Sequence, residues 1–141
     1  MRATALAHVR GGGRAYHYEL AWQSAVPGVG AAHLVDVPFF FGNLDQPGVP
    51  ALLGDEARTD PATVALGRAR SAALAGFVVD GHPDADLLGP WPPYADHDRA
   101  TMLLDRAPRL ERERLAERLD FWSAHHDAAA GPLATTLGAL E

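Results

Sequence analysis

The order of apolar and polar residues divides the chain into helical and extended stretches. Apolar side chains at helical spacing, with turn residues at their ends, predict four helical stretches, at residues 1–9, 36–41, 62–79 and 110–128. Three consecutive glycines, Gly11 to Gly13, end the first helix, because glycine adopts the left-handed conformation that closes helices. The last helix is amphipathic, with Leu115, Leu119 and Trp122 on one face.

The two stretches that are predicted as strands lie far apart in the sequence. They are residues 15–22 (AYHYELAW) and residues 100–105 (ATMLLD). Gly- and Pro-rich segments predict loops at residues 24–32, 43–61 and 81–93. A sheet of two isolated strands is only marginally stable, and the apolar run at residues 37–41 (VPFFF) needs a surface to cover. The pattern therefore indicates part of a larger fold.

Composition narrows the class of protein. The chain has 141 residues, of which 48% are hydrophobic, so it is globular rather than disordered. The net charge is -6, and the densest basic stretch, residues 106–118, also contains glutamates. Both features argue against a nucleic-acid partner. No apolar run suggests a membrane span or a signal sequence, and no membrane partner is expected. The absence of cysteine excludes disulfides and thiolate chemistry and, with the missing signal sequence, favours the cytoplasm.

A histidine lies beside the most apolar part of the chain. In residues 30–44 (GAAHLVDVPFFFGNL), His33 follows two alanines and precedes Asp36 and the phenylalanine run. The pKa of histidine lies near neutrality, so the ring can take and return a proton in catalysis. A single histidine next to phenylalanines is nevertheless more often a packed residue than a catalytic one. The residues around it decide between the two interpretations.

Five segments, in order along the chain, carry a resemblance to one enzyme family. The first two are AYHYELAW and the His33 segment, in which Gly30, His33, Asp36, Pro38, Phe39, Phe41 and Gly42 fit a Gly-x-x-His-x-x-Glu/Asp motif followed by Pro-Phe-x-Phe-Gly. The other three are FVVDGHPDADLLGPWPPY at residues 77–94, RATMLLD at residues 99–105, and Arg118 with Trp122. Together they resemble the C-terminal portion of the type B carboxylesterases, the family of the cholinesterases and the bacterial para-nitrobenzyl esterases. The chain departs from that pattern at Leu74, Val78 and Val79.

The resemblance implies both a fold and a role for His33. The fold class is α/β, as the C-terminal part of an α/β-hydrolase: the last sheet strand or strands with flanking helices and loops, incomplete as a sheet on its own. Residues 1–130 would form this segment, and residues 131–141 a loose tail. By resemblance, His33 is the triad base that activates a serine toward a small-molecule carboxylic ester, with no cofactor or metal. Asp36 and Gly30 would support the histidine without taking part in the reaction.

The rest of the catalytic machinery is missing from the sequence. The Gly-x-Ser-x-Gly nucleophile motif does not occur, and the only serines are Ser24, Ser71 and Ser123. No oxyanion loop is found, and the family's acid lies upstream of the matching segment. We therefore expect the isolated chain to be inactive. On this interpretation it would be a truncated reading frame, a gene remnant, or one half of a split esterase whose other, N-terminal chain carries the serine.

Two other functions stay open at this point. The chain could be a non-catalytic binding or structural module that keeps the hydrolase scaffold, or a small enzyme that uses His33 with Asp36. Other candidate residues favour structural roles. His125 and His126, followed by Asp127, point about 100° apart on a helix and so do not face one metal ion. His17 is expected to be half-buried on its strand, and residues 91–94 (WPPY) to form a packed corner.

Overall fold

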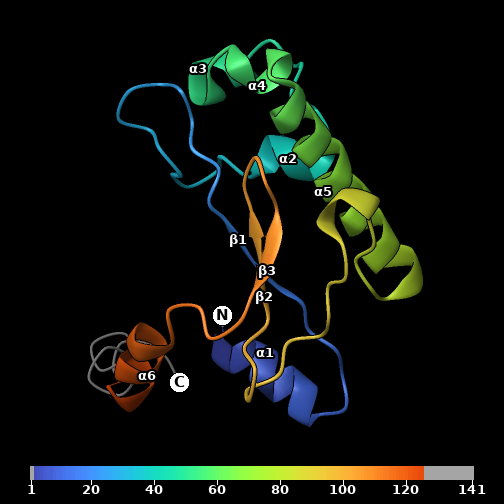
Figure 1. Cartoon of the computed structure of the whole chain (residues 1–141), viewed down its shortest axis with the longest axis vertical. Helices are drawn as coiled ribbons and strands as arrows, with labels where there is room; N and C mark the ends of the chain where they lie inside the picture. The colour runs from blue at the N-terminus through green and yellow to red at the C-terminus, as the bar shows by residue number, and fades with distance from the viewer. Residues whose placement is uncertain (1, 126–141) are drawn as a thin grey trace, which may run out of the picture.

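The structure is a computed structural model that describes residues 2–125. Its helices are α1 (Arg2–Arg10), α2 (Val37–Phe41), α3 (Val49–Leu53), α4 (Glu56–Thr59), α5 (Pro61–Asp80), the 3-10 helix η1 (Asp86–Leu88) and α6 (Ala116–Ala124). Its strands are β1 (His17–Leu20), β2 (Thr101–Leu104) and β3 (Arg109–Glu111). Helices α2 to α5 gather at one end of the sheet, and α1 and α6 lie toward the other end (Figure 1).

The sheet has three strands in the order β1-β2-β3. β1 pairs with β2 in parallel, with His17 opposite Thr101 and Leu20 opposite Leu104. β3 pairs with the other edge of β2 and runs antiparallel to it. The two strands that the sequence predicted are thus neighbours, although about eighty residues separate them, and within the described residues β1 keeps one edge unpaired.

Helix α5 has well-defined ends and supports most of the neighbouring elements. The Asp60 side chain accepts hydrogen bonds from the backbone N–H groups of Ala62 and Thr63, which caps the helix, and Pro61 occupies the first turn. Gly81, with φ at 75°, ends it in the left-handed conformation. Helices α2 and α4 and the 3-10 helix η1 pack against α5.

The length and hydropathy of α5 correct one expectation. No run long enough to span a membrane was expected, but α5 is long and apolar enough to cross one by length and composition alone. This is weak evidence, because the core helix of a soluble protein passes the same test. Arg70 lies within this helix, and its side chain is buried against the protein's own aromatic rings.

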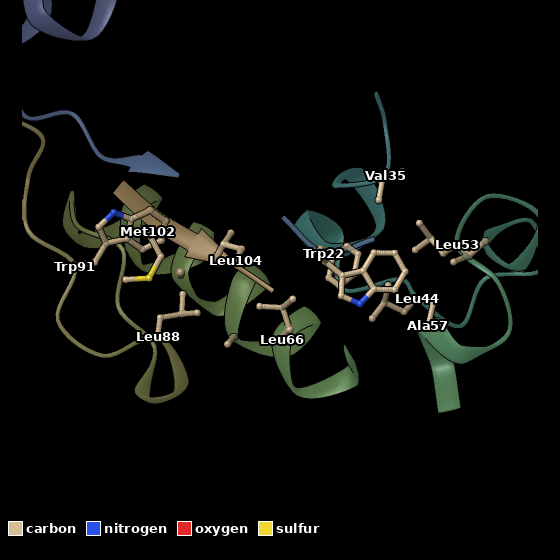
Figure 2. Packing of buried hydrophobic residues seen from close by; sticks show 14 residues of the cluster. Trp22, Val35, Leu44, Leu53, Ala57, Leu66, Leu88, Trp91, Met102 and Leu104 are labelled. Carbon is tan, nitrogen blue, oxygen red and sulfur yellow. The ribbon is translucent and has the colours of Figure 1, made fainter. Parts of the chain in front are cut away.

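The hydrophobic core fills the space between the sheet, α2 and α5. Its largest fully buried side chains come from the loop after β1, from α2, α3 and α5, and from β2 (Figure 2): Trp22, Phe39, Leu53, Leu66, Met102 and Leu104. All four residues of β2 are buried, as a central strand requires. The core therefore fixes the start of the loop that follows β1, where Trp22 is anchored.

Two segments differ from the expectation. Residues 110–128 were expected to form one helix, but Arg109–Glu111 form β3, and α6 begins only at Ala116. Pairing with β2 satisfies the backbone of these residues and packs Leu110 against the core, which outweighs their helical pattern. The expected apolar face of α6 is largely uncovered: Leu115 precedes the helix, and Trp122 is 60% exposed.

The expected loop at residues 43–61 contains α3 and α4, which are too short to produce a periodic pattern.

An ion pair joins β1 to the segment after β3. The Arg114 guanidinium donates two hydrogen bonds to the Glu19 carboxylate, over 2.7 and 2.8 Å, and a third to Glu111. These bonds lower the pKa of Glu19. We expect Glu19→Gln to reduce the free energy of unfolding at pH 7 by about 0.5–1 kcal/mol, a modest loss because water screens this partly exposed pair.

The pH dependence of this loss has a definite sign. A carboxylate whose pKa is lower in the folded state stabilises the fold above its unfolded pKa, and this stabilisation disappears as the pH falls through the folded pKa. Denaturant unfolding should therefore separate wild type from Glu19→Gln at pH 7 and bring them together at an acid pH below the folded pKa of Glu19. Glu117→Gln, at an exposed position of α6, is the matched control. An equal difference at both pH values would contradict the prediction.

Candidate active site

His33 lies at the edge of an open hollow beside β1. The hollow has a volume of about 580 Å³ and is lined by α1, β1 and the loop that follows Gly30. His17 and Tyr18 point to opposite faces of β1 and both line the hollow, so it lies along the edge of β1 that is unpaired within the described residues. The His33 side chain is exposed to solvent. The histidine is therefore not packed among the phenylalanines that follow it in sequence.

Buried neighbours hold the His33 loop in place. Val35 and Phe39 are fully buried and anchor the loop to the core, while the backbone N–H of Val35 donates to the carbonyl of Ala32 over 3.3 Å. Leu34, directly after the histidine, has φ at 73°, a left-handed conformation that is unfavourable for a branched side chain. Gly30 also has a positive φ, of 57°, which glycine adopts without strain. The loop thus stores backbone strain beside an exposed histidine, a pattern that is common at functional sites.

Asp36 shares the hollow with His33 and is held by a tyrosine. The Tyr18 hydroxyl donates a hydrogen bond of 3.4 Å to Oδ2 of Asp36. The backbone carbonyl of Asp36 accepts from the N–H groups of Phe39 and Phe40 at the start of α2. Sequence reasoning missed Tyr18, although the alternation of Tyr16, His17 and Tyr18 along the strand placed it on the face opposite His17. Its hydrogen bond connects β1 to the His33 loop.

Within residues 2–125, the His33 ring has no hydrogen-bond or ion-pair partner. None of the three serines bonds to His33. The hydroxyls of Ser24 and Ser123 donate to the backbone carbonyls of Leu52 and Leu119, and Ser71 lies within α5. The same residues contain no group of three His, Asp or Glu side chains that could hold a metal ion. A nucleophile and an acid for His33 would have to come from outside this part of the chain.

The other candidate residues have structural surroundings. His17 is half-buried, with its ring 5.2 Å from that of Tyr94, and burial lowers the pKa of His17. Trp91 and Tyr94 are buried, which confirms the packed corner. His125 stacks on Phe121 at the end of α6. His126, Asp127 and the expected tail at residues 131–141 lie outside the described residues.

Curated proteins that resemble this chain are hydrolases. No family model matches the sequence. The acylcarnitine hydrolase of Rattus norvegicus is 33% identical over 97 residues, which is 69% of this chain and 16% of that protein. The phenmedipham hydrolase of Pseudarthrobacter oxydans is 32% identical and the para-nitrobenzyl esterase of Bacillus subtilis 28% identical, covering 71% and 72% of this chain and 20% of each relative.

The solved structures that align with this chain are esterases as well. The carboxylesterase EST55 of Geobacillus stearothermophilus aligns with a TM-score of 0.71 and 28% identity, over 86% of this chain and 24% of its own length. A PNB esterase aligns with a TM-score of 0.65 and 26% identity, over 74% of this chain and 21% of its own. This chain is similar to a segment of the type B carboxylesterases. Its three-stranded sheet and helices are part of an α/β-hydrolase fold.

The carboxylesterase-like segment is much shorter than its relatives. It spans 16% to 20% of the length of the curated proteins it matches. Its homologues are carboxylesterases, so the segment has an ester-hydrolase origin. His33 and Asp36 line one hollow, and Gly30 lies just before them in the sequence.

Proposed function

We propose that this segment supplies the general-base histidine, His33, of a carboxylic-ester hydrolase whose serine, acid and oxyanion-hole donors lie outside it. The observation that supports the proposal most strongly is the position of His33. It lies exposed at the end of the loop that follows β1, on a strained and well-anchored turn, with no partner among the described residues. Catalytic residues of α/β sheets come from loops at the carboxyl ends of parallel strands, and this loop follows such a strand.

The reaction would need one proton to move twice. The serine hydroxyl would give its proton to the neutral His33 ring as its oxygen attacked the ester carbonyl. The ring would then return that proton to the departing alcohol, leaving an acyl-enzyme that water hydrolyses in a second cycle of the same kind. Asp36 is not placed to orient the ring, because its carboxylate accepts from the Tyr18 hydroxyl and has no hydrogen bond to His33. We propose that Asp36 and Gly30 shape the loop.

The serine-bearing part would cover the hollow and the open edge of β1. Within the described residues, β1 is hydrogen-bonded on one edge only, and an unpaired parallel strand edge is a template for another strand. Large apolar side chains are also exposed, among them Phe41 at 70%, Val78 at 74% and Val79 at 80%. Such exposed apolar surface is typical of a protein–protein or domain interface.

Joining the segment to a hydrolase that lacks its own histidine loop tests the proposal. In this chimera, the part of this chain that matches the Bacillus subtilis para-nitrobenzyl esterase replaces the corresponding segment of that enzyme. We expect the purified 141-residue chain to release no para-nitrophenolate from para-nitrophenyl acetate above its His33→Ala variant, because it contains no nucleophile elbow. The chimera is expected to turn over the ester.

Two results would contradict the proposal. The first is His33-dependent turnover by the isolated chain, which would favour a small independent enzyme that uses His33 with Asp36. The second is a chimera that unfolds cooperatively, as followed by circular dichroism, yet is inactive. A non-catalytic module predicts this second result, since such a module would keep the fold and lack a working base.

A further inference from the structure

A second pocket, separate from His33, contains a buried arginine. Arg70 lies in the middle of α5 and is only 5% exposed. Its guanidinium carbon lies 3.8 Å from the centre of the Phe40 ring and 4.2 Å from that of Tyr18. No carboxylate among the described residues forms an ion pair with it. The Tyr18 hydroxyl donates to Asp36, and the charge of this carboxylate acts on Arg70.

Burying this charge without an anion is unfavourable. Burial lowers the pKa of Arg70, but a guanidinium stays protonated throughout the physiological pH range. Contacts with aromatic faces recover only part of the lost hydration. Buried charges in proteins are usually paired directly, whereas the carboxylate that acts on Arg70, that of Asp36, is bonded to Tyr18 and forms no ion pair with the guanidinium.

The pocket in front of Arg70 has a suitable size and lining for a small ligand with an apolar body. Its volume is about 190 Å³. Its walls come from β1, α2, α5 and the packed corner and are mainly apolar: Tyr16, Phe40, Ala73, Leu74, Phe77 and Trp91. A mostly apolar cavity with one convergent charged group is the usual form of a ligand site.

The packing of Arg70 restricts how an anion can approach. The rings of Phe40 and Tyr18 lie on two adjacent sides of the guanidinium, with their centres 5.6 Å apart, and the N–H groups lie in the guanidinium plane. A planar fork of donors is best matched by a carboxylate, whose two oxygens accept two parallel hydrogen bonds. The aromatic walls would contact a ring attached to that carboxylate through edge and face contacts.

We propose that this pocket binds a small aromatic monocarboxylate, with its carboxylate on the in-plane N–H groups of Arg70 and its ring between Phe40, Phe77 and Trp91. The site is distinct from the His33 hollow and does not depend on the proposed catalytic role. Only Tyr16 and Tyr18 line both cavities.

Benzoate and its neutral analogue benzamide are the probes for this site. In calorimetric or NMR titrations of the purified 141-residue chain, benzoate should bind saturably, and benzamide should bind at least about 10-fold more weakly because it has no charge for Arg70. Arg70→Met, which keeps an apolar stem and removes the charge, should weaken benzoate binding roughly 10- to 100-fold. Arg68→Met is the matched control, since Arg68 is exposed on the same helix and should leave the affinity unchanged.

Three outcomes would overturn the proposal: equal affinity for benzoate and benzamide, unchanged benzoate affinity in a folded Arg70→Met variant, or no saturable binding by wild type. The last would assign the missing anion to an acidic side chain from the rest of a hydrolase. The comparison of the two probes uses wild type alone, so it decides the question even where Arg70→Met does not fold. None of these outcomes bears on His33, whose test uses ester turnover.

Discussion

Replacing His33 by alanine in the hydrolase chimera is expected to lower kcat/KM for para-nitrophenyl acetate by about 10⁴-fold or more. Without an imidazole, the serine hydroxyl keeps its proton during attack, and the leaving alcohol has no acid to protonate it. The other histidine that lines the hollow beside β1, His17, is half-buried against Tyr94, whereas the His33 ring is exposed. Most of the loss should therefore appear in kcat.

Matched variants separate a catalytic histidine from a structural one. His82→Ala removes an exposed histidine in the turn after α5, far in sequence from the hollow, and should leave kcat/KM unchanged. Asp36→Asn should cost far less than His33→Ala, because its carboxylate is bonded to Tyr18 rather than to the histidine. If the losses for Asp36→Asn and His33→Ala were equal, Asp36 would be the acid partner. A His33→Ala chimera that kept its activity would remove His33 from the mechanism.

The loop that carries His33 was predictable because its conformation is local. Gly30 favours a turn by its conformational freedom, and the phenylalanine run signals an anchored helix start. The structure confirms a short helix at Val37–Phe41, and Phe39 is fully buried. The exposure of His33 could not be predicted from its apolar neighbours, because it depends on which side of the turn faces the core.

Long-range contacts decided the elements that the sequence did not reveal. β2 pairs with β1 on one edge and with residues 109–111 on the other. Residues 109–111, whose sequence pattern is helical, form a strand because of this pairing with β2. The helices α3 and α4 have only five and four residues, and they are held by packing, α4 against α5 and α3 against α4, rather than by periodicity. In each case the energy that determines the structure comes from residues distant in sequence.

The same reason explains why the second pocket could not be foreseen. Arg70 occupies a helix that has only an imperfect apolar face, and nothing in residues 62–79 indicates that this arginine is buried while Arg68 is exposed. Its burial follows from the position of Phe40 in α2 and Tyr18 in β1, which the fold brings to one place. The hydrogen bond from Tyr18 to Asp36 has the same origin.

Trp22 joins several of these distant elements and is the residue on which the fold should depend most. It is 1% exposed, and its ring lies 5.2 Å from that of Phe39. Its indole N–H donates to the Thr63 hydroxyl over 3.0 Å, and that hydroxyl donates to Asp60, the N-cap of α5, over 2.6 Å. Arg106, which follows β2, reaches the same carboxylate over 3.0 Å. A single side chain thus links the end of β1 to the start of α5.

Trp22→Ala should lower the free energy of unfolding by about 3–5 kcal/mol, the usual cost of removing a large buried aromatic side chain. Domains are typically stable by only about 5–15 kcal/mol, so much of the total would be lost. Trp22→Phe should cost less, since it keeps a ring against Phe39 and removes the hydrogen bond to Thr63. Trp122→Ala, at a position 60% exposed, should change stability by less than about 0.5 kcal/mol. Urea unfolding followed by far-UV circular dichroism measures all three, and equal losses for the two alanine variants would show that Trp22 does not hold the core together.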